Sequence, residues 1–182
     1  MQRLAIFVFA VLLTGCSTTT KSLRMAVNVP SSTSFEFIDS RAPQDRTAYP
    51  PEGTLRAASF ADDNMIPTPP ELIKAWLQQA LASELKGKPV ELESFDFGLS
   101  FNRGGTNPGH APGVALVDLG MNSALGPKVV FVRIGLSVKG RRVYVNASDR
   151  YFGVASEANL MDTLNKARDS LVEQVRNAAA VS

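Results

Sequence analysis

The single histidine and the single cysteine are the first residues to consider as candidates for chemistry. His110 has no Asp, Glu or Cys beside it in the sequence, whereas a metal site needs several ligands at defined spacing. A Ser-His-Asp triad would have to use His110, and nothing resembling a nucleophile elbow is present. We therefore expect no catalytic residue, no metal site and no cofactor in this chain.

A glycine-rich stretch around Arg103 resembles a phosphate-binding loop only superficially. Arg103 is followed by two glycines, but the segment lacks the Gly-Lys-Ser/Thr ending of such loops, and no helix follows it directly. We interpret residues 102–113 as a long connection between two strands.

Two further groups of charged residues lie near predicted strand ends. Asp39 and Arg41 are two residues apart, so they point the same way if the strand continues, and they could pair with each other or with Arg46. A structural ion pair or turn cap is the expectation here, and a binding role is the alternative. Arg141 and Arg142 flank a predicted hairpin turn, where they form a solvated strand end or contact an acidic partner or lipid headgroup.

The first sixteen residues have the order of a secretory signal. Arg3 supplies a positive charge, residues 4–13 are almost entirely apolar, and small residues precede Cys16. This order is typical of a signal peptide with its cleavage site. The apolar run has about ten residues, while a membrane-spanning helix needs roughly 20. The segment is therefore too short to remain as a transmembrane helix.

The four residues at 13–16, Leu-Thr-Gly-Cys, resemble the lipobox of bacterial lipoproteins. The resemblance implies cleavage after Gly15, a diacylglyceryl group on the thiol of Cys16 and a third acyl chain on its new amine. Two or more acyl chains anchor a protein stably. Ser17, where inner-membrane lipoproteins of Gram-negative cells tend to have Asp, implies the outer membrane, facing the periplasm. The alternative is a secreted protein with a free thiol, because Cys16 has no disulfide partner in the chain.

Composition favours one domain without a strong electrostatic partner. Removing residues 1–15 from the 182-residue chain leaves 167 residues, a common size for one domain. The precursor has 19 basic and 17 acidic residues. Such a near-neutral balance predicts no strong attraction to nucleic acid or to anionic lipid. We expect the lipidated cysteine and a flexible Ser/Thr-rich tether over residues 16–34, followed by one domain over residues 35–182.

The predicted elements alternate in type along this domain. A short strand covers residues 35–38, and residues 54–60 could add another. A helix over residues 71–86 begins at the capping box of Thr68 and Glu71 and ends at Gly87. Trp76 lies on its apolar face, where we expect core packing and weigh a ligand platform as the alternative.

The second half of the chain is predicted to be mostly sheet. A strand over residues 90–101 changes its alternation near Glu93, which indicates a bulge. Residues 114–119 could form a short strand. Residues 128–138 and 141–148 form a hairpin around Lys139 and Gly140. An amphipathic helix begins after Ser156, and its apolar stripe either packs on the sheet or seats a partner helix.

This order of strand, helix, three strands and helix predicts an α+β fold. We expect a two-layer sandwich of a mainly antiparallel sheet with both helices on one face. The order, behind a lipoprotein signal, resembles the YajG-like family of small Gram-negative lipoproteins. The resemblance depends on the sequence Phe-Glu-Phe-Ile-Asp-Ser-Arg at 35–41, the helix at 71–86, the hairpin at 129–148 and the closing helix at 157–178. It implies an α+β domain anchored to the outer membrane.

Three functions are compatible with these features. The first is a non-catalytic binding module, accessory to an envelope protein complex. The second is a lipid carrier, with the phenylalanines of residues 95–101 lining an apolar cavity, although plain core packing explains them as well. The third is an envelope hydrolase, whose paired carboxylates would converge only in the fold. Convergence of two acidic groups in one pocket is therefore the feature to examine.

Overall fold

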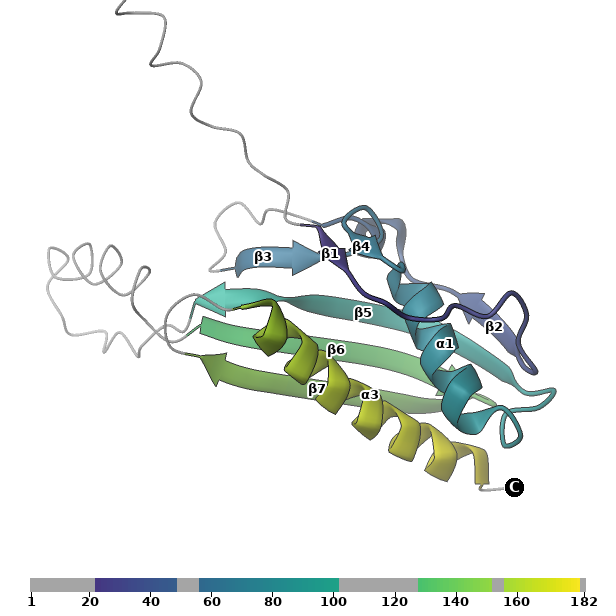
Figure 1. Cartoon of the computed structure of the whole chain (residues 1–182). Helices are drawn as coiled ribbons and strands as arrows, with labels where there is room; N and C mark the ends of the chain where they lie inside the picture. The colour runs from purple at the N-terminus through teal and green to yellow at the C-terminus, as the bar shows by residue number, and fades with distance from the viewer. Residues whose placement is uncertain (1–21, 49–55, 102–127, 152–155, 181–182) are drawn as a thin grey trace, which may run out of the picture.

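A computed structural model describes residues 22–48, 56–101, 128–151 and 156–180. These residues form a five-stranded sheet, two helices and a small two-stranded sheet (Figure 1). The strands of the main sheet are β2 (Glu36–Asp39), β3 (Arg56–Phe60), β5 (Pro89–Phe101), β6 (Lys128–Val138) and β7 (Arg141–Tyr151). Their order is β2-β5-β6-β7, and β3 pairs with the other half of the same edge of β5.

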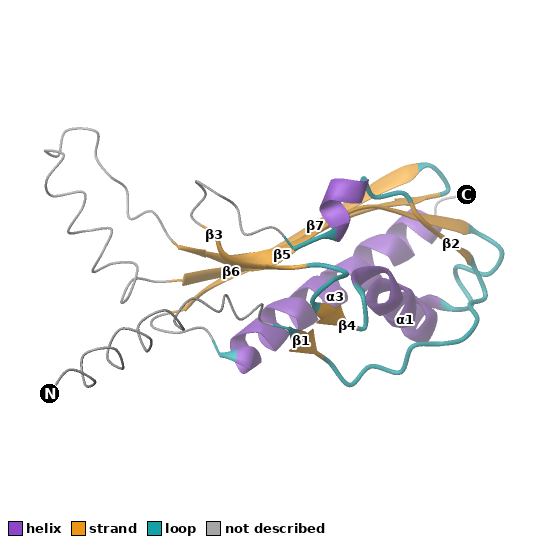
Figure 2. Cartoon of the chain, turned by 90° about the horizontal axis from the view of Figure 1, so that it is seen from above, coloured by secondary structure: helices purple, strands orange, loops and turns teal. Residues whose placement is uncertain are grey.

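The main sheet and its two helices make two layers. All strand pairs of the main sheet are antiparallel except β2 with β5. Figure 2 shows α1 (Pro69–Leu81) and α3 (Glu157–Ala180) on the same side of the sheet. This arrangement confirms the predicted α+β sandwich. None of the helices in the described ranges is long and apolar enough to cross a membrane.

The helix α1 begins at the predicted capping box but ends before Gly87. The backbone N–H and the hydroxyl of Thr68 both donate to Glu71 Oε2 at 2.9 Å. At the other end, the Ser34 hydroxyl donates to the carbonyl of Ala82 at 2.7 Å, so this carbonyl has a partner outside the helix. A series of turns continues to Gly87, where φ is +67°. The predicted helix over residues 71–86 is therefore too long by five residues at this end.

The predicted bulge in β5 allows both halves of this strand to contribute to one core. The register with β6 shifts between Leu92 and Ser94. One extra residue exchanges the two faces of a strand, so Val90 and Leu92 before the bulge and Phe95 and Phe97 after it are all buried. The hairpin from β6 to β7 is also confirmed, with positive φ at both of its turn residues.

The core lies between the sheet and the helices. β6 contributes Val130, Val132, Ile134, Leu136 and Val138, each with 0 % of its surface exposed. The apolar stripe of α3 packs against this face, which confirms core packing for that stripe. It consists of Leu160, Leu164, Ala167, Leu171 and Val175. Trp76 is 7 % exposed and belongs to the same core.

Part of the predicted tether packs against the domain. β1 (Leu23–Arg24) pairs in parallel with β4 (Met65–Ile66), and Leu23 is 4 % exposed. Met25 and Val27 also pack against the core. Leu23, Met25 and Val27 therefore pack with the domain, although they lie within the range predicted to be a tether. Apolar residues at 23, 25 and 27 alternate as in a strand, but the partner strand lies some 40 residues away in sequence.

Candidate functional site

Several residues singled out by the sequence lie outside the described ranges. Cys16, His110, the segment 102–113 and the predicted strand at 114–119 are among them. Within residues 22–48, 56–101, 128–151 and 156–180, no group of three or more His, Cys, Asp or Glu side chains could hold a metal ion. The candidate sites of the described part are a buried ion network, two cavities and one edge of the sheet.

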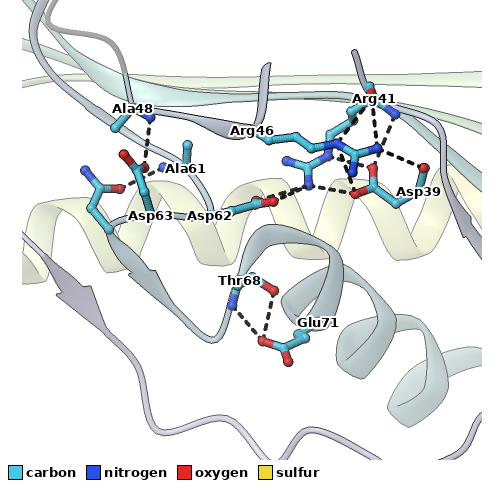
Figure 3. A network of polar contacts seen from close by, with 10 residues as sticks. Asp39, Arg41, Arg46, Ala48, Ala61, Asp62, Asp63, Thr68 and Glu71 are labelled. Carbon is cyan, nitrogen blue, oxygen red and sulfur yellow. Dashed lines mark hydrogen bonds and ion pairs between the residues drawn. The ribbon is translucent and has the colours of Figure 1, made fainter. Parts of the chain in front are cut away.

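The buried network is centred on Arg41, at the end of β2 (Figure 3). Arg41 is 2 % exposed. Its Nε donates to Asp39 Oδ1 at 2.8 Å and its Nη2 to Asp39 Oδ2 at 2.9 Å. The same Nη2 lies 3.0 Å from both carboxylate oxygens of Asp62, in the turn between β3 and β4. Arg46 donates to the backbone carbonyl of Arg41 at 3.1 Å. The predicted pairing of Asp39 with Arg41 is confirmed.

The network favours the charged forms of Asp39 and Arg41. The hydrogen bond from Arg41 holds the pKa of the Asp39 carboxyl below its usual range, against the opposite effect of partial burial. Burial lowers the pKa of the Arg41 guanidinium, but the hydrogen bonds to Asp39 and Asp62 outweigh burial and raise it. A buried arginine paired on two sides is an electrostatic clamp between segments distant in sequence.

The clamp acts on structure and presents no reactive group. Arg41 Nη1 is buried without a hydrogen-bond partner, but Arg41 lines neither of the two cavities described below. Asp62, the partner that the sequence did not indicate, is followed by Asp63, whose carboxylate accepts a hydrogen bond from the backbone N–H of Ala48 at 2.9 Å. These contacts fix the turn that leads from β3 into β4 and on to α1.

One cavity is a groove between α1 and α3, of about 470 Å³. Trp76, Ala80 and Val172 supply apolar surface, and charged residues of both signs from α3 surround it. Trp76 is almost fully buried, so it offers little surface for stacking a ligand. The groove therefore gives no indication of the chemistry of a ligand.

A second cavity, of about 350 Å³, lies beside β3, β5 and the short 3-10 helix η1 (Pro43–Arg46). Asp45 and Asp96 both line it, so two acidic residues do share one pocket. Asp96 also pairs with Arg133 across the sheet, with 3.5 Å between Nη1 and Oδ2. Two acidic residues in one pocket are the feature that the sequence analysis associated with an envelope hydrolase.

The outer edge of β7 is the most extended free backbone surface of the described residues. The two-residue turn makes Val138 and Arg141 the closing pair of the hairpin, so Arg141 bonds to β6 through its backbone. Hydrogen bonding alternates along an antiparallel strand, and the register continues without a shift to Tyr151. The even-numbered residues therefore direct their N–H and C=O groups outward: Arg142, Tyr144, Asn146, Ser148 and Arg150.

The side chains of these five residues lie on the face of the sheet opposite the helices, and all five are exposed. Arg142 stands at one end of the edge and Arg150 at the other. Arg142 is 84 % exposed in its side chain and lies 3.6 Å from Glu93. Asp149, the acidic residue of β7, is paired with Lys166 on α3 at 2.7 Å. The free edge of β7 is therefore positively charged at both ends.

The sequence pointed to Arg142 but not to this edge. A strand shows in sequence by its alternation, whereas its position at the edge of a sheet depends on which strands pair. No family model, no characterised protein and no solved structure was found to match this chain. The function must therefore be inferred from the geometry of the described residues.

Proposed function

We propose that this chain is a lipid-anchored, periplasm-facing accessory protein of the outer membrane that binds an extended segment of an envelope protein along β7. The anchor is the lipidated Cys16 of the mature chain. The observation that carries the binding proposal is the free edge of β7, an 11-residue strand with five outward-facing residues. A peptide that adds a strand to such an edge gains affinity from main-chain hydrogen bonds.

The charges on the free edge of β7 favour an acidic strand over a second copy of β7 as its partner. Two copies of β7 paired antiparallel and centred on Asn146 would place Arg142 of each copy opposite Arg150 of the other. Like charges directly opposite each other destabilise a strand pair, so these arginines oppose self-association. A strand with acidic residues about eight positions apart, roughly 26 Å, would instead pair with both arginines.

A crosslinking experiment in cells tests the binding proposal. The full anchored chain carries a photoreactive residue at position 148 of the edge or, as a control, at Asn165, which is exposed on α3. We expect an adduct with an envelope protein from position 148, absent from position 165. Asn146→Pro removes one outward N–H and should abolish the adduct, and peptide mapping should place the captured segment in an extended acidic stretch.

Three results would contradict the binding proposal: no adduct from position 148, an adduct that persists with Asn146→Pro, or an adduct with a second copy of the chain. The anchor is tested separately with Cys16→Ser. This variant should move from the membrane fraction to the soluble fraction, and retention in the membrane would contradict lipid anchoring.

An envelope hydrolase is the second candidate, supported by the cavity that Asp45 and Asp96 share. Paired carboxylates act as acid and base in glycoside hydrolysis. Asp45→Asn with Asp96→Asn would abolish any hydrolysis of purified cell wall by the anchored protein but would leave crosslinking from β7 intact.

A further inference from the structure

We infer that the β1–β4 end of the domain rests on the lipid surface, with Ile66 among the lipid headgroups and Arg24 on their phosphates. This inference rests on the proposed anchor at Cys16. It concerns a different surface from the free edge of β7 and assigns the orientation of the domain on the membrane.

The length of chain between the anchor and the first strand limits this orientation. Leu23 lies seven positions after Cys16, a stretch that spans at most about 24 Å when fully extended and about 15 Å when relaxed. A domain of this size has a radius of gyration of about 15 Å and is therefore about 40 Å across. The side of the domain opposite β1 is thus too far away to reach the membrane.

The surface nearest the anchor has the chemistry of a membrane contact. Leu23 and Met65 are paired in register and face the core, and the next pair, Arg24 and Ile66, faces outward. Ile66 is 55 % exposed, although it is a large apolar residue. Among the described residues no acidic side chain pairs with Arg24. An exposed apolar side chain beside an exposed cation suits the headgroup region of an anionic bilayer.

One isoleucine and one arginine would not hold the domain on a membrane alone. The lipid anchor supplies the proximity, because a short linker raises the effective concentration of this surface at the bilayer. In Figure 1, β1 and β4 lie near the edge of the sheet that β3 forms, whereas β7 forms the opposite edge. The contact therefore directs the free edge of β7 away from the membrane and toward partners.

Site-specific labelling of the lipidated chain in vesicles tests this orientation. Cys16 is the only cysteine and carries the lipid, so Ile66→Cys and Ser148→Cys each create one free thiol for an apolar fluorophore. The vesicles contain phosphatidylglycerol and a phospholipid with a nitroxide quencher on its headgroup. We expect quenching at position 66 and none at position 148. Arg24→Gln should reduce the docked fraction at position 66 by up to about fivefold, with Lys86→Gln, at another exposed cation, as the unchanged control.

The outcomes separate this inference from the proposed anchor. Equal quenching at positions 66 and 148 in protein that floats with the vesicles would overturn the orientation and leave the anchor intact. Protein that does not float would overturn the anchor, and the orientation with it. Unchanged quenching at position 66 in Arg24→Gln would contradict the proposed contact of Arg24 with lipid phosphates.

Discussion

The two edges of the main sheet are built in opposite ways. One edge of β5 is covered by the short strands β2 and β3, and the Arg41 clamp ties the end of β2 to the turn after β3. β7, at the other edge, pairs with β6 on its inner side, and on its outer side it has neither a described strand nor such a clamp among the described residues.

The two edges differ because different interactions hold their strands in place. β2 has four residues and β3 has five, so few ladder hydrogen bonds hold them, and the buried ion network adds contacts between segments far apart in sequence. β7 is held along its whole length by the hairpin with β6 and by α3. Its outer groups are therefore not needed for folding, which leaves them available for binding.

The largest expected effect comes from breaking the clamp. Arg41→Ala leaves the carboxylates of Asp39 and Asp62 near each other without their cation, so we expect a loss of about 3–5 kcal/mol in the free energy of unfolding. Arg46→Ala is the matched control, because its side chain is 43 % exposed, and it should cost less than about 1 kcal/mol. Urea unfolding measures both variants, and equal losses would show that burial of Arg41 has no special role.

A pair of prolines at β7 compares its inner and outer hydrogen bonds. Ala147→Pro removes an N–H that bonds to β6 and should cost about 3 kcal/mol of unfolding free energy. Asn146→Pro, one residue away, removes an outward N–H and should cost about 1 kcal/mol, from backbone strain alone. Thermal unfolding of the two variants gives the comparison, and the reverse order would mean that the assignment of inner and outer residues is wrong.

The third prediction concerns the strand that the sequence had assigned to a tether. Leu23→Ala should lower the free energy of unfolding by about 2–3 kcal/mol, because Leu23 is 4 % exposed in the core. Arg24→Ala, on the outward side of the same strand, should change it by less than about 0.5 kcal/mol. A flexible tether would show no loss with either substitution in denaturant unfolding.

The smallest expected effect is the dependence of the clamp on pH. The pKa of Asp39 is lower in the folded chain than its ordinary value of 3.8. Its contribution to stability is therefore complete above pH 3.8 and is lost as the pH falls through the folded pKa. We expect the unfolding free energy of the native chain to fall more steeply below pH 4 than that of Asp39→Asn. Parallel pH profiles of the two proteins would contradict this expectation.

Local patterns were enough to predict most of the fold. The alternation of β6, the capping box of α1, the bulge at Glu93 and the stripe of α3 are all signals within a few residues of one another. β1 and β4 were missed because each has two residues and its partner lies far away in sequence.

The candidate sites were predicted less completely for the same reason. Asp39 and Arg41 are neighbours, so their pairing was predictable, whereas Asp62 comes from a turn 21 residues further along. The pocket shared by Asp45 and Asp96 and the free edge of β7 both depend on how strands assemble. Such features follow from strand order, which alternation within one strand does not specify.

Amide hydrogen exchange along β7 of the anchored chain tests the central claim most directly. If the edge is free for a partner, the outward amides of Tyr144, Asn146 and Ser148 should exchange much faster than the amides of Val145 and Ala147, which bond to β6. Uniformly slow exchange along β7 in the absence of a partner would show that the edge is already covered and would contradict the proposed function.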